Sequence, residues 1–454
     1  AFYPLMQLII RDLIYRSPLN RFVSFYSNAS YTYDDKYVLS GSIRWDRSNL
    51  WGTNSKYQNK PLWSVGGSWN IYKEKFFQAD FVDMLKLRAS YGIGGNIGRN
   101  TAPYLIASYY DSSLVDGMAG SVNTPPNKDI RWEKTTTVNV GVDFALFRHR
   151  LSGTIEYYNK YSVDLLAAIN GSPTQGFGYT TLMTNNGKMV NRGVEITLSG
   201  EIIRQKDFSW NASLLYAFNR NKVKHISVQP SLWDSRISMP TSYPMVGKPL
   251  YGIYAYKWAG LNENGDPQVY DAENNVTSGP ARDYHALVYC GTTVPIHNAS
   301  LTNVLRYKGF EFSAMLILDA GHKLRSSNIP SINMSNGRIT STAKGIVDRW
   351  TQPGDVTDVP RLLFSNDTEN FNTHRTELYR YSDLFVYDAS NIRLSNISLA
   401  YRVPAHWCKK ISLSGARLQF NVENVATFAF DSKANYDLGG KVKPNYVWGL
   451  YLNF

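Results

Sequence analysis

Hydrophobic and polar residues alternate along most of the chain, in runs of about ten residues separated by polar connections. A period of two is the pattern of a β-strand whose two faces meet different surroundings. The last ten residues show it most clearly, because one face carries Tyr446, Trp448, Leu450, Leu452 and Phe454 while the other is small or partly polar. Three aromatic side chains on one face, with no Lys or Pro to protect the edge, are typical of a strand that faces lipid.

The same alternation predicts about 13 strands, the first beginning near Arg21. Short charged turns such as residues 34–36 and 148–150 alternate with long polar loops. The three longest predicted loops cover residues 94–133, 220–296 and 321–389, and shorter loops are expected near residues 47–60, 163–189 and 425–444. Strands of this length, with short turns on one side and long loops on the other, are typical of outer-membrane barrels.

The sequence therefore predicts an all-β fold, a transmembrane antiparallel β-barrel formed by residues 21–454, with residues 1–20 as a loop or partial strand. An odd number of strands conflicts with the even number found in single-chain bacterial barrels. Two open edges in lipid would leave backbone groups unpaired at a cost of several kcal/mol each. The rest of the barrel is expected to come from another chain or from residues beyond this sequence.

Composition supports a barrel over the alternatives. The 454 residues include 32 Tyr, 20 Phe and 11 Trp, yet the mean hydropathy is only −0.32 and no apolar run is long enough for a transmembrane helix. The net charge is +12, but the basic residues are dispersed along the chain, so nucleic acid is not an expected partner.

Five segments, taken together and in order, resemble the SusC/RagA family of TonB-dependent outer-membrane transporters of Bacteroidetes. They are Tyr31–Asp46, Leu85–Gly92, Trp132–Asp143, Asn191–Leu198 and Ile392–Tyr401. The resemblance covers nearly the whole chain. It implies a 22-stranded barrel with a plugged lumen, to which this chain contributes roughly strands 10 to 22.

The resemblance also implies a function and a set of partners. The function is active import of oligosaccharides or oligopeptides across the outer membrane, with no cofactor and no chemistry performed on the cargo. The implied partners are a SusD-like surface lipoprotein, the N-terminal part of the same transporter and, through the plug in that part, the TonB–ExbB–ExbD system. The alternative is a passive porin or an adhesin-type barrel, which a plug and a TonB box would exclude. An outer-membrane enzyme is a weaker third interpretation, because no nucleophile and base are found in a known catalytic spacing.

Two groups of residues are candidates for contact with cargo. Aromatic and arginine side chains in the long loops suit sugar or peptide binding, but they equally suit packing against a lid protein; the substrate-binding candidates are Trp233, Tyr254, Tyr256, Tyr284, Arg349 and Trp350. Polar residues on the inward face of the strands would line the lumen; they are Asp143, Glu195, Thr197, Gln419, Asn421 and Glu423.

Other motifs favour structural roles. The segment Asn262–Asp266 partly matches a calcium-binding loop, but an Asn-Gly turn explains it better. The glycines of residues 92–98 do not have the spacing of a nucleotide-binding loop, and we expect a strand end there. No metal site is expected. Cys290 and Cys408 fall on opposite sides of the membrane in this topology, so both are predicted to be free thiols.

Overall fold

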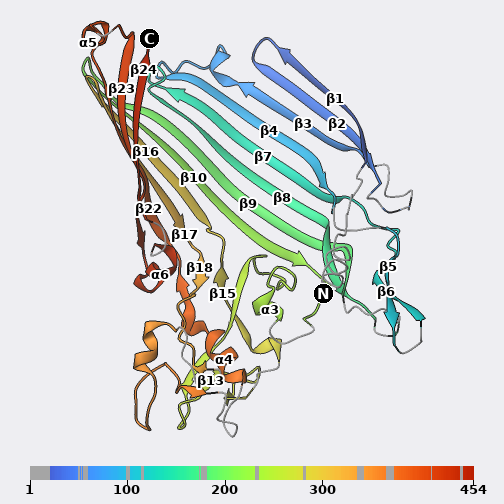
Figure 1. Ribbon diagram of the computed structural model, residues 1–454. Coiled ribbons are helices and arrows are strands. Elements are labelled where there is room, and N and C mark those ends of the chain that lie inside the picture. Colours follow the sequence, from blue (N-terminus) through green and yellow to red (C-terminus); the bar gives the residue numbers. More distant parts are fainter. Residues whose placement is uncertain are drawn as a thin grey trace, which may run out of the picture.

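The computed structural model consists of one large curved sheet with folded loops gathered at one end (Figure 1). It describes residues 21–49, 52, 54, 60–98, 103–113, 117–172, 174, 181–230, 235–279, 283–334, 342–364, 373–410, 412–439 and 443–454. The loop or partial strand predicted for residues 1–20 lies outside the described residues.

Thirteen strands form a single antiparallel sheet in which each strand is hydrogen-bonded to the next one of the order. They are β1 (Phe22–Tyr33), β2 (Tyr37–Ser48), β3 (Leu62–Asn70), β4 (Val82–Asn96), β7 (Glu133–Leu146), β8 (Leu151–Asn170), β9 (Thr181–Arg204), β10 (Phe208–His225), β16 (His297–Tyr307), β17 (Phe310–Ala320), β22 (Asn391–Arg402), β23 (Gly415–Ala429) and β24 (Asn445–Asn453). The predicted strand number is confirmed. Within the described residues the sheet does not close, because β1 and β24 each have one neighbour.

The strand register keeps apolar and polar residues on opposite faces. Leu198, Leu214, Leu301 and Leu316 are successive cross-strand partners on β9, β10, β16 and β17. On the opposite face, the neighbouring row of cross-strand partners starts with Ser199 of β9 and Ser213 of β10. On the apolar face, large side chains remain exposed, as a surface that contacts lipid requires.

The predicted terminal strand illustrates this exposed apolar face. All five of its outward residues are exposed, from 42% for Leu452 to 92% for Phe454. Trp448 packs against Phe420 of β23 with ring centroids 4.2 Å apart, so the aromatic side chains also stabilise the strand pair.

Short connections lie at one end of the sheet and long loops at the other, as predicted (Figure 1). The short end carries η1 (Ile71–Lys73) and α5 (Ala405–Lys409). Cys408 lies in α5, whereas Cys290 lies in a strand at the long-loop end, and both are free thiols as expected.

The predicted loop boundaries were wrong in several places because the strands continue beyond them. Pairing between β8 and β9 covers most of the predicted loop 163–189, and β10 and β23 extend into the predicted loops 220–296 and 425–444. Alternation breaks down in these extensions: residues 165–169 of β8 are apolar at five successive positions, and four of the last five residues of β10 are polar, so a period of two no longer marks them as strand. The predicted loop 94–133 also contains a separate hairpin, β5 (Ile106–Ser112) with β6 (Gly117–Thr124).

The two longest loops fold together into a compact unit, which we call the loop assembly (residues 226–296 and 321–390). Its strands are β11 (Gly252–Tyr256), β12 (Trp258–Leu261), β13 (Pro267–Tyr270), β14 (Val276–Thr277), β15 (Leu287–Thr292), β18 (Lys323–Arg325), β19 (Asn333–Met334), β20 (Leu363–Phe364) and β21 (Val386–Asp388). Its helices are α3 (Ser235–Ser238), η3 (Tyr284–Ala286), η4 (Lys344–Asp348), α4 (Thr373–Arg380) and η5 (Asp383–Phe385). The last loop adds η6 (Ser432–Ala434) and α6 (Asn435–Leu438). Among the residues with a described placement, no helix is long and apolar enough to cross a bilayer.

The packing of Tyr158 on the polar face of the sheet depends on a glycine. The Tyr158 side chain of β8 is only 8% exposed and covers Gly193 of β9. A Cβ atom at residue 193 would overlap the Tyr158 hydroxyl and would lie 2.5 Å from the Phe218 carbonyl oxygen. An aromatic ring over a glycine on a neighbouring strand is a known way to stabilise a sheet.

We expect Gly193→Ala to destabilise this region by about 1–3 kcal/mol, because the tyrosine ring has to move. Gly94→Ala is the matched control, since a Cβ at that strand position meets no atom within 4 Å. Thermal unfolding of the complete purified protein should show a lower midpoint for Gly193→Ala than for Gly94→Ala. Equal midpoints would show that the packing of the Tyr158 ring does not require glycine at residue 193.

Candidate functional site

A charged cluster crosses the polar face of the sheet where β4, β7 and β8 run side by side. The Arg88 guanidinium lies 2.8 Å from the Asp143 carboxylate and also pairs with Glu156. The Thr154 hydroxyl donates a hydrogen bond of 3.0 Å to the same Asp143 carboxylate. Such a network suits the water-filled or plugged interior of a barrel, where charges remain partly solvated.

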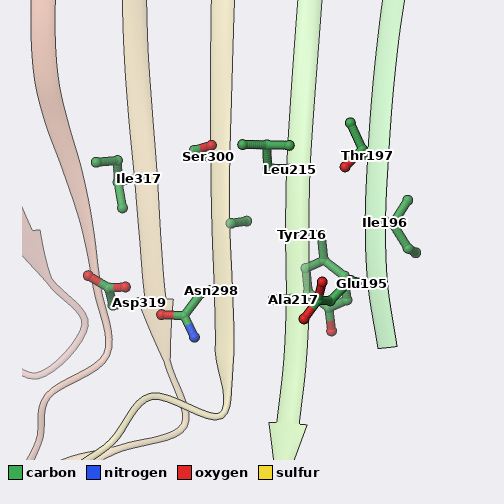
Figure 2. Close-up of a pocket in the computed structure, with 11 residues that line it drawn as sticks. Glu195, Ile196, Thr197, Leu215, Tyr216, Ala217, Asn298, Ser300, Ile317 and Asp319 are labelled. Atoms are coloured by element: carbon green, nitrogen blue, oxygen red, sulfur yellow. The ribbon is translucent and has the colours of Figure 1, made fainter. Parts of the chain in front are cut away.

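A shallow depression of about 310 Å³ lies on the same face, across β9, β10, β16 and β17 (Figure 2). Two cross-strand rows build it. The row nearer the long loops contains Glu195, Ala217, Asn298 and Asp319, and the next row contains Thr197, Leu215, Ser300 and Ile317. The short side chain of Ala217 leaves open space between the two carboxylates of its row.

The depression combines three kinds of surface. Asp319 is paired with Arg393 over 3.3 Å, whereas Glu195 is exposed and forms no hydrogen bond or ion pair with another described residue. Asn298 and Ser300 provide hydrogen-bonding groups. Leu215 is 52% exposed, and Ile317 is the other large apolar side chain of the two rows. The site can therefore contact an apolar group, hydrogen-bonding groups and one positive charge.

Tyr254 and Tyr256 lie inside the loop assembly, not on its surface. They are 1% and 0% exposed and pack with Val269 and Leu378 in its core. The Tyr254 hydroxyl accepts a hydrogen bond of 3.3 Å from the Met245 backbone N–H, and burial raises the pKa of Tyr254. These two candidates therefore have a packing role and leave no surface for cargo.

The other candidates lie on separate elements. Tyr284 of η3 is half-buried, with the Arg236 guanidinium 5.0 Å from its ring centroid. Arg349 and Trp350 follow η4; Arg349 is exposed, and Trp350 is half-buried and packs over Gly265. Trp233 lies outside the described residues. Contact between these residues and cargo stays a prediction.

Asp266 connects the two halves of the loop assembly, a role that sequence reasoning missed. Its carboxylate accepts hydrogen bonds of 2.9 and 3.1 Å from Arg361 and one of 3.0 Å from Arg375. Arg375 is 2% exposed and also donates to the backbone carbonyls of Ile332 and Arg361.

The Asn262–Asp266 turn joins β12 to β13, as expected, and no group of possible metal ligands is found among the described residues.

Comparison with known proteins identifies the family. The model of the TonB-dependent receptor-like β-barrel family matches residues 11–425. The chain belongs to this family. Its place in the outer membrane and the predicted SusC/RagA resemblance are thereby confirmed.

Several relatives were found at moderate identity. TonB-dependent receptor P3 of Formosa agariphila is 27% identical over 456 residues, which cover 94% of this chain and 43% of the receptor. TonB-dependent receptor SusC of Bacteroides thetaiotaomicron is 25% identical over 427 residues, or 89% of this chain and 40% of SusC. These relatives are named as receptors and not as enzymes. The chain spans less than half the length of each.

A solved structure shows the same fold. The RagAB peptide transporter matches with a TM-score of 0.77 at 23% sequence identity, covering 96% of this chain and 48% of that chain. The open sheet described above therefore corresponds to one part of a larger β-barrel.

We expect Asp266→Asn to loosen the loop assembly while the barrel stays folded. The substitution leaves the buried Arg375 guanidinium without its counter-charge, and breaking such a pair costs roughly 3 kcal/mol or more. Hydrogen exchange should become faster in β13 and α4 and stay unchanged in β9 and β10. Glu263→Gln, at an exposed position of the same turn, should leave exchange unchanged. Unchanged protection in α4 of Asp266→Asn would refute the proposed role of Asp266.

Proposed function

We propose that this chain forms the C-terminal part of a barrel that imports oligosaccharides or oligopeptides in a TonB-dependent way, together with a SusD-like surface lipoprotein. The observation that carries the proposal is a sheet of membrane-facing strands whose inner face is polar and whose long loops fold into one unit at the outer end. Polar cargo needs such an inner wall because it loses its hydration in an apolar one.

The comparisons support the energy-coupled interpretation over a passive pore. TonB dependence is part of the names of the family and of the curated relatives. The residues that would contact TonB are expected in the part of the transporter that this chain does not span. The name of the RagAB complex describes a peptide transporter, which supports a peptide as one class of cargo.

The depression on the lumenal wall is the proposed contact between this chain and passing cargo. Exposed Leu215 and the unpaired Glu195 carboxylate suit a peptide with an apolar and a basic side chain better than they suit a neutral sugar. Sugar rings can stack on aromatic faces, and two of the aromatic candidates, Tyr254 and Tyr256, are buried in the loop assembly.

Uptake of labelled oligopeptides and oligosaccharides by cells that express the complete transporter tests the function. Energy-coupled import should stop when the protonmotive force is collapsed, whereas diffusion through a porin should continue at the same rate. Uptake that persists without the protonmotive force would establish the passive barrel instead.

We expect Leu215→Trp to slow uptake by roughly tenfold, equivalent to about 1.4 kcal/mol in the barrier, because the larger side chain fills the depression. Leu214→Trp is the matched control, since the neighbouring side chain points to the lipid side, where tryptophan is well tolerated. Equal uptake by the two variants, at equal amounts in the outer membrane, would show that cargo does not pass this part of the wall.

A further inference from the structure

The lipid-facing side of the sheet contains a groove that the import function does not explain. It has a volume of about 560 Å³ and is lined almost wholly by apolar side chains of β1–β4 and β7. Tyr31, Leu39, Gly67, Ala89 and Val140 form its central row, each paired with the next across neighbouring strands. Large side chains occur at both ends of this row, and the small Gly67 and Ala89 form the floor between them.

An aromatic wall borders the groove on the side of the short connections. The Tyr37 and Trp69 rings stack with centroids 6.3 Å apart. One carboxylate holds both: Glu74 accepts a hydrogen bond of 2.5 Å from the Tyr37 hydroxyl and one of 3.1 Å from the Trp69 indole N–H. The wall is therefore fixed by hydrogen bonds before any ligand arrives. A surface that only touches exchanging lipid does not need side chains fixed in one position, whereas a binding site gains affinity from them.

Charged side chains of both signs lie directly beyond this wall. Lys73 and Lys75 flank Glu74 in the connection from β3 to β4 and are exposed. The Glu74 carboxylate lies 3.9 Å from the Lys36 ammonium, which also pairs with Asp34. Neither Lys73 nor Lys75 forms an ion pair with a carboxylate in the described part of the chain. Both ammonium groups lie at the membrane surface, with the Lys73 Nζ 6.0 Å from the Tyr72 ring centroid. Basic side chains at this depth bind lipid phosphates.

We propose that this groove binds one acyl chain of a phospholipid from the periplasmic leaflet, with the lipid phosphate held by Lys73 and Lys75. The short connections face the periplasm in outer-membrane barrels, so the groove opens toward that leaflet. Its volume lies in the usual range for small-molecule sites, roughly 300–1,000 Å³. A smaller apolar hollow, of about 350 Å³, lies on the same face across β17, β22, β23 and β24. In the larger groove an acyl chain would lie between the aromatic wall fixed by Glu74 and the floor of Gly67 and Ala89.

Mass spectrometry of the complete transporter, extracted in mild detergent, can count the phospholipids that stay bound. Ala89→Leu fills the floor of the groove and should retain one phospholipid fewer than the unchanged protein. Ala314→Leu adds the same atoms on the lipid-facing side of β17, away from the groove, and should retain the full number. Equal retention by Ala89→Leu and Ala314→Leu would overturn the proposal.

The two lysines and the position of the lipid need separate measurements. Lys73→Gln combined with Lys75→Gln should reduce retention of an anionic phospholipid several-fold. A phospholipid with a photoreactive group on its acyl chain should label peptides that contain Leu39 or Leu87. This experiment uses the unchanged protein, so its result does not depend on whether a variant folds. Labelling spread evenly over the lipid-facing strands would show an ordinary lipid annulus. Cross-links between two copies of this chain at these residues would assign the groove to a protein contact.

Discussion

The structure depends on one constraint: within a membrane, every strand has to find hydrogen-bond partners for its backbone in another strand. The thirteen strands satisfy this requirement by pairing with their neighbours, without a break from β1 to β24. The outer edges of β1 and β24 are the two places where the requirement is unmet within the described residues. The chain shares the fold of the RagAB peptide transporter but covers only 48% of that chain, so we expect further strands of a larger barrel to meet the requirement.

The same pairing fixes which side chains meet lipid and which meet the lumen, because a shift of one residue would exchange the faces. Rows of leucine on one side and of serine and threonine on the other follow from this register. The depression around Ala217 and the groove over Gly67 and Ala89 have the same origin on opposite faces. The groove forms where the small residues Gly67 and Ala89 are neighbours in one cross-strand row, and the depression forms where Ala217 lies between the longer side chains of its row.

The sequence was most informative where the environment differs most between the two faces. Strand number, the lipid-facing residues of β24, the sidedness of the loops and the free thiols of Cys290 and Cys408 could all be predicted from alternation. Alternation disappears near the ends of β8 and β9, where residues 165–169 of β8 are apolar at five successive positions, and these extensions were taken for a loop. The loop assembly could not be derived in this way. The ion pairs of Asp266 with Arg361 and Arg375 join residues about 100 positions apart, which no local sequence pattern connects. The burial of Tyr254 and Tyr256 follows from the same long-range packing.

We propose that this chain is one part of a single plugged importer barrel. The mass and composition of the intact complex, extracted from the outer membrane in mild detergent, test it most directly. We expect one barrel whose remaining strands and plug come from the N-terminal part of the same transporter, accompanied by a surface lipoprotein. A complex that contains only copies of this chain, closed into a pore without a plug, would contradict it.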